Sequence, residues 1–80
     1  MFKTTLKLNN KIYEAEGETL LEAFNELVKP LAYPKTKMLR TSGLVTVYGK
    51  KKTEVNLRIM PLKRFINNKV SREIWANRLQ

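Results

Sequence analysis

The chain has 80 residues, a length that allows one small domain and leaves no room for two cores. It contains no cysteine and no histidine, which excludes disulfides, thiolate zinc sites, thiol catalysis and histidine general-base chemistry. Its formal net charge is +9, and its 42% of hydrophobic residues is ordinary for a globular protein.

The first residues alternate between apolar and polar, which predicts a half-buried strand over residues 2–8. The two asparagines at 9–10 suit a tight hairpin turn, because asparagine tolerates positive φ. A second strand over residues 11–16 would then pair with the first and set Leu6 opposite Tyr13. In this register the apolar residues share one face, and lysines pair with glutamates on the other.

A helix is predicted next. The sequence TLLE at residues 19–22 fits a capping box, in which the Thr19 hydroxyl accepts from the Glu22 N–H and the Glu22 carboxylate reaches back. Helical spacing of apolar residues follows, and Pro30 should end the helix near Lys29. The glutamates of this region suit the early turns, where the helix dipole favours negative charge; paired catalytic carboxylates are the alternative interpretation.

Residues 29–34 form a connector between two prolines, and a second pair of strands follows it. The first strand of this pair is expected to be long, within residues 35–49, and Ser42-Gly43 could be a bulge or a break within it. Pairing Val47 with Thr53 places the apolar residues of both strands on one face. That pairing requires an odd-numbered loop, either the three residues Gly49-Lys50-Lys51 or five residues.

Pro61 fits the first turn of a closing helix. The apolar residues before Asn67-Asn68 and those after them would lie on different sides of one ideal helix. We therefore expect either two short helices with a bend at the asparagines, or one helix whose second stripe meets another molecule. The order β-β-α-β-β-α predicts a single α+β domain over residues 1–80, with an antiparallel sheet of about four strands and helices packed on one face.

The charge is divided unevenly along the chain. Residues 1–28 carry three lysines and five glutamates, whereas residues 29–80 carry 13 basic residues and two glutamates. Such asymmetry indicates a polyanionic partner, or an acidic surface on another protein.

Three groups of basic residues are candidates for phosphate contacts. The first is the lysine triple at the predicted hairpin tip, which could equally be a solvated turn that prevents edge-to-edge strand pairing. The second lies on the sheet face opposite the core and on the connector, and consists of Lys35, Lys37, Arg40, Tyr48 and Arg58. An aromatic between arginines on this face could stack a base, unless the face is simply solvated. The third is the closing helical segment. The candidate nucleic-acid-binding residues are Lys50, Lys51, Lys52, Arg40, Arg58, Tyr48, Lys63, Arg64, Lys69 and Arg72.

Trp75 and Leu79 in the closing segment are candidates for a protein interface, although a tryptophan is more often a core residue than a contact. For catalysis, the sequence has no glycine-rich phosphate loop and no carboxylate cluster with metal-ligand spacing. It therefore predicts no enzyme activity, no cofactor, no metal and no small-molecule substrate.

The sequence favours a small basic protein that binds the phosphate backbone of DNA or RNA with little sequence specificity. The alternative is a small structural or adaptor subunit of a large assembly, such as a phage or viral particle or a ribonucleoprotein. An accessory protein that inhibits a nucleic-acid enzyme is a third hypothesis, which no feature favours. The start has no signal-peptide core and no apolar run approaches the ~20 residues of a membrane helix, so a cytoplasmic or particle-associated protein without membrane contact is expected.

Overall fold

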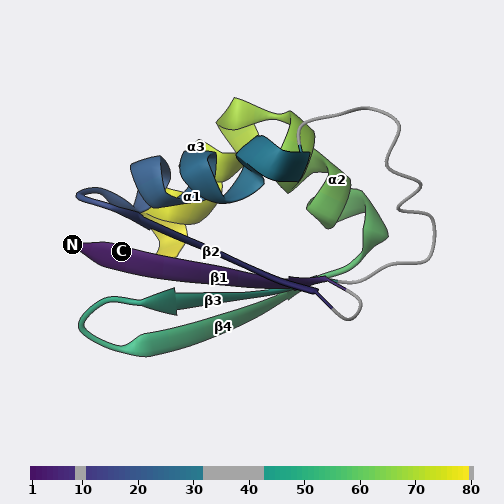
Figure 1. The fold of residues 1–80 in the computed structure, drawn as a ribbon. Helices are drawn as coiled ribbons and strands as arrows, with labels where there is room; N and C mark the ends of the chain where they lie inside the picture. Colours follow the sequence, from purple (N-terminus) through teal and green to yellow (C-terminus); the bar gives the residue numbers. More distant parts are fainter. Residues whose placement is uncertain (9–10, 32–42, 80) are drawn as a thin grey trace.

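The computed structural model describes residues 1–8, 11–31 and 43–79, and its elements form a sheet with helices on one side (Figure 1). In chain order these are β1 (Phe2–Leu8), β2 (Lys11–Gly17), α1 (Leu20–Val28), a 3-10 turn η1 (Lys29–Leu31), β3 (Gly43–Tyr48), β4 (Lys52–Leu57), α2 (Ile59–Asn67) and α3 (Lys69–Leu79). The predicted α+β class and ββαββα order are confirmed, with the closing helix divided in two.

The four strands form one sheet in the order β2-β1-β3-β4. β1 runs antiparallel to both of its neighbours, so β2 and β3 are parallel to each other. The chain must therefore cross over β1 between them, and α1 lies in this crossover, packed against β2 and β1. The crossover fixes which face of the sheet the helices cover.

Both predicted hairpin registers are confirmed. Leu6 lies opposite Tyr13 in the first hairpin, and Val47 lies opposite Thr53 in the second. The second hairpin turns through the three residues between Tyr48 and Lys52, which is the shorter of the two odd-numbered loops predicted from the parity of its apolar residues.

The helix ends follow the capping signals of the sequence. The backbone N–H of Glu22 donates to Thr19 Oγ1 over 3.1 Å, whereas the described residues show no reciprocal bond from the Thr19 N–H to the Glu22 carboxylate. Asn68 separates α2 from α3: its N–H donates to the Arg64 carbonyl at the end of α2, and its Oδ1 accepts from the Val70 N–H at the start of α3. The first of the two expected arrangements, two helices with a bend at the asparagines, is the correct one.

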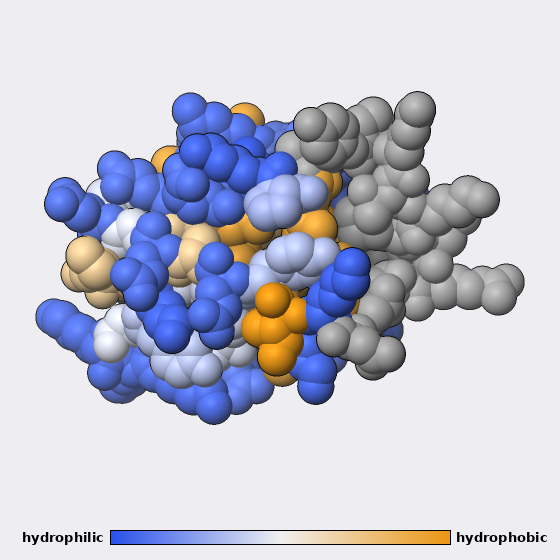
Figure 2. All heavy atoms as spheres, viewed as in Figure 1, coloured by the Kyte–Doolittle hydropathy of each residue, from blue (hydrophilic) through white to orange (hydrophobic). Residues whose placement is uncertain are grey.

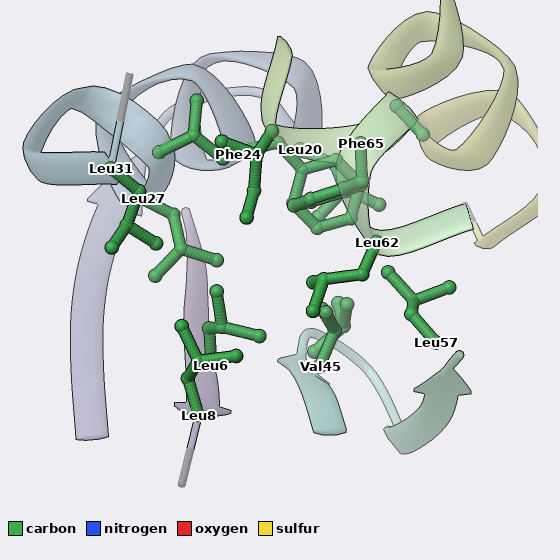
Figure 3. Close-up of a cluster of buried hydrophobic side chains, with 14 residues drawn as sticks. Leu6, Leu8, Leu20, Phe24, Leu27, Leu31, Val45, Leu57, Leu62 and Phe65 are labelled. Atoms are coloured by element: carbon green, nitrogen blue, oxygen red, sulfur yellow. The ribbon is translucent and has the colours of Figure 1, made fainter. Parts of the chain in front are cut away.

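The core lies between the helices and the sheet (Figure 3). Phe24 of α1 and Phe65 of α2 meet edge to face, with ring centroids 5.0 Å apart, and Leu6 of β1 and Val45 of β3 point toward them from the sheet. All four residues are at most 1% exposed. Burying a side chain of this size contributes about 1.5–3 kcal/mol, so this cluster holds the helical layer on the sheet.

Gly17 ends β2 at the point where the chain passes into α1. A Cβ atom at this position would lie 2.6 Å from the backbone nitrogen of Ala23 and 3.0 Å from the carbonyl carbon of Glu22. Because both are backbone atoms, they cannot rotate away. The absence of a side chain at Gly17 therefore allows α1 to approach the end of β2.

We expect Gly17→Ala to lower the free energy of unfolding by about 1–3 kcal/mol, because the new methyl group must displace the first turns of α1. Urea unfolding followed by circular dichroism would measure this loss. The exposed neighbour Glu18 supplies the control, since Glu18→Ala should change stability by less than about 0.5 kcal/mol. Equal effects of the two substitutions would contradict the close approach of α1.

Candidate nucleic-acid interface

The face of the sheet opposite the helices, called here the open face, carries three rows of residues that lie directly opposite one another across the strands. The end row is Glu16, Lys3, Tyr48 and Lys52; the middle row is Glu14, Thr5, Thr46 and Glu54; the far row is Ile12, Lys7, Leu44 and Asn56. Three lysines and three glutamates thus share this face, which is neutral overall.

Positive charge gathers at one end of the sheet. Tyr48 lies between Lys3 of β1 and Lys52 of β4, and the adjoining turn carries Lys50 and Lys51, both exposed. Tyr48, at the centre of this arrangement, is accessible to solvent, since it is 40% exposed. We call the five residues Lys3, Tyr48, Lys50, Lys51 and Lys52 the hairpin end.

Lys52 has a carboxylate neighbour on its own strand. Its Nζ lies 3.5 Å from Oε1 of Glu54, and both side chains are about half exposed. A surface ion pair of this kind contributes about 0–1 kcal/mol, because water screens the charges and both side chains lose freedom. Lys52 can therefore exchange Glu54 for a phosphate at little cost.

A hollow of about 810 Å³ lies behind the turn, on the helix side of the sheet. It is lined by apolar groups of Phe2, Val47 and Leu79 and by Lys50 and Lys51. The start of β1 and the end of α3 come together at this end of the sheet (Figure 1). The lysine triple is thus divided: Lys52 belongs to the open face, whereas Lys50 and Lys51 border the hollow.

The other predicted basic residues do not join the hairpin end. Arg58 precedes α2, beyond the end of β4 that is remote from the turn, and Lys63 and Arg64 lie on α2 itself. Lys69 begins α3. Arg40, together with the connector lysines Lys35 and Lys37, lies outside the described residues.

Arg72 has a structural position that the sequence pattern did not reveal. Its Nη1 donates to the carbonyl oxygens of Phe65 and Ile66 at 2.8 and 2.9 Å, and its Nε donates to Oδ1 of Asn25 at 2.8 Å. The guanidinium thereby joins the C-terminal end of α2, where carbonyls lack helical partners, to α1 and α3. Burial lowers the pKa of Arg72, yet arginine stays protonated at any working pH.

The predicted protein-interface pair packs inward. Trp75 and Leu79 are half-buried against the core, and the Arg78 guanidinium lies over the Trp75 ring, 5.5 Å from its centroid. The apolar side chains that α3 presents to solvent are instead Val70, 59% exposed, and Ile74, 48% exposed.

Hydrophilic side chains cover most of the side of the molecule seen in Figure 2, with small separate apolar areas between them. Residues 1–8, 11–31 and 43–79 contain no cluster of three carboxylates that could hold a metal ion. Within the part of the chain that the structure describes, no helix combines the length and the apolar character needed to cross a membrane.

Comparison with known proteins adds no relative to this picture: no family model matches the chain, and neither the curated proteins nor the solved structures contain a match.

We expect Arg72→Met to lower the free energy of unfolding by about 1–2 kcal/mol. This value is toward the low end of the range for hydrogen bonds that involve a charged group, because the guanidinium is partly hydrated. The substitution keeps an unbranched apolar stem and removes all three bonds. Urea unfolding would measure the loss, with exposed Lys69→Met on the same helix as control. A loss no larger than that of the control would show that the guanidinium does not hold the three helices together.

Proposed function

We propose that the protein binds nucleic acid through the hairpin end, with its lysines on phosphates and little preference for sequence. The observation that supports this most directly is the end row of the open face, in which Tyr48 is flanked by Lys3 and Lys52 beside a turn that carries two more lysines. Lysine is a flexible point charge, suited to following a phosphate backbone rather than to reading base edges.

The net charge of +9 supports the same proposal. A polyanion that approaches a basic protein releases its condensed counterions, and this release supplies most of the affinity of binding that lacks sequence specificity. The charge of the whole molecule steers the encounter, whereas the hairpin end supplies the contacts.

The glutamates of the open face limit how far the interface extends. Glu14 and Glu54 occupy both edges of the middle row, and Glu16 lies opposite Lys3 in the end row. Phosphates laid along the whole face would meet these carboxylates, and like charges at close range repel. The proposed contact is therefore confined to the hairpin end and its turn.

We expect Lys50→Ala with Lys51→Ala to weaken binding and to flatten its salt dependence. Each lost phosphate contact reduces the slope of log K against log salt by about 0.7 for a single strand or 0.9 for a duplex, so two contacts account for roughly 1.4–1.8. Fluorescence anisotropy with labelled oligonucleotides, from low to physiological salt, measures both quantities.

The matched control is Lys7→Ala with Lys11→Ala. These lysines lie at the opposite end of β1 and β2, and the double variant loses the same formal charge. Its salt slope should stay close to that of the unmodified protein. Equal losses in the two double variants would mean that charge alone, rather than the hairpin end, governs binding, and absence of binding at low salt would refute the proposed function.

A second candidate function is that of a structural or adaptor subunit in a larger assembly. The observation that favours it is the exposure of Val70 and Ile74, one turn apart on the outer side of α3, because a helix usually turns such β-branched residues toward a core. Arg78 follows Ile74 at the same spacing, so a basic residue continues this side of the helix.

If α3 mediates self-assembly, the melting temperature should rise with protein concentration, since association stabilises the folded state by mass action. Val70→Ser with Ile74→Ser should remove this dependence. Because both side chains are exposed, the stability of the dilute monomer should change by less than about 0.5 kcal/mol per site. Differential scanning calorimetry over a wide concentration range provides the test, and a constant melting temperature would exclude self-assembly through this surface.

A further inference from the structure

The position of Tyr48 bears on which form of nucleic acid the hairpin end accepts. Tyr48 is the last residue of β3, an inner strand, and its side chain belongs to the open face. The helices cover the other face, so they do not shield the ring (Figure 1). An aromatic ring on an uncovered sheet face is a surface on which a planar base can stack.

Lysines stand on both sides of this ring. Lys3 and Lys52 lie directly opposite Tyr48 on the two neighbouring strands, each about 4.8 Å away in the direction of strand pairing. Lysine stems pack along neighbouring apolar surface while their charged ends stay in water. The site therefore offers one place for a base and a cation on either side for the phosphates before and after it.

A duplex cannot use this arrangement. Its bases are paired and stacked on one another, so none is free to lie on Tyr48 unless it leaves the helix at a cost of a few kcal/mol. Its second strand also carries phosphates of its own. The middle row, with Glu14 and Glu54, begins only two residues from Tyr48, about 7 Å along the strands, and would repel them.

From this geometry we infer that the hairpin end binds single-stranded DNA or RNA in preference to a duplex, with an unpaired base stacked on Tyr48 between Lys3 and Lys52. The inference rests on the proposed function and deepens it by naming the substrate class. The turn lysines, Lys50 and Lys51, hold the phosphates of the strand where it passes the end of the sheet.

The test compares three labelled probes at one salt concentration: an oligothymidylate, a strand of equal length that carries abasic residues in place of its bases, and a duplex of equal length. The abasic strand has the phosphates without the bases, so it isolates the contribution of stacking. We expect the oligothymidylate to bind about 5- to 30-fold tighter than the abasic strand, within the range for one stacked base.

Two substitutions test whether the Tyr48 ring causes this difference in affinity between the base-bearing and abasic strands. Tyr48→Leu should remove most of the preference for the base-bearing strand over the abasic strand, whereas Tyr48→Phe should preserve that preference. Circular dichroism and the melting temperature show whether each variant keeps its fold. The probe comparison on the unmodified protein needs no variant, so the inference can be tested even if Tyr48→Leu does not fold.

The outcomes separate the two proposals. Equal affinity for the base-bearing and abasic strands, or duplex binding as tight as that of the single strand, would overturn the inference while leaving phosphate binding intact. A preference that survives Tyr48→Leu unchanged would also overturn it. Failure of all three probes to bind would instead remove the proposed function on which the inference rests.

Discussion

The pairing register of β1 with its two neighbours is the constraint on which the rest of the structure depends. Leu6 lies opposite Tyr13 on one side and opposite Val45 on the other, so one face of three strands becomes apolar at once. A shift of one residue would turn lysines toward the helices and leave leucines in water. The same register sets Tyr48 between Lys3 and Lys52. The arrangement of the hairpin end is therefore determined by the alternation that builds the core.

The hairpins and the start of the first helix could be predicted from the sequence, because each depends on residues that are close together along the chain. Apolar parity predicted both hairpin registers and an odd number of residues in the turn after Tyr48, and Thr19 marked the start of α1. The strand order was beyond such reasoning, since the contact between β1 and β3 joins segments far apart in sequence. The position of Arg72 was hidden for a related reason. Its hydrogen-bond partners are backbone carbonyls of α2 and the side-chain amide of Asn25 in α1. A pattern of basic residues in the sequence does not distinguish an arginine that joins helices from one that could contact a phosphate.

Acidic residues are concentrated early in the sequence and basic residues late, but the two sets do not occupy separate faces of the molecule. The early hairpin contributes Glu14 and Glu16 to the same sheet that carries Lys52, so acidic and basic residues share the open face. Positive charge remains concentrated at the turn after Tyr48, which extends past the paired strands, while α2 and α3 carry a separate basic set. Linear counts of charge predict a polyanionic partner, but it is the sheet pairing that determines where the basic residues of the strands lie.

The central position of the first strand also affects how the chain acquires its structure. β1 can pair with β2 as soon as the first hairpin exists, but its other edge stays open until β3 arrives from much later in the chain. Pairings between distant segments form slowly, because a long loop must close before any contact is gained. During that interval an unpaired strand edge is a template for aggregation, which charged side chains oppose. Lys3 and Lys7 project from β1, so residues that later lie on the open face would protect the nascent sheet from pairing with other chains.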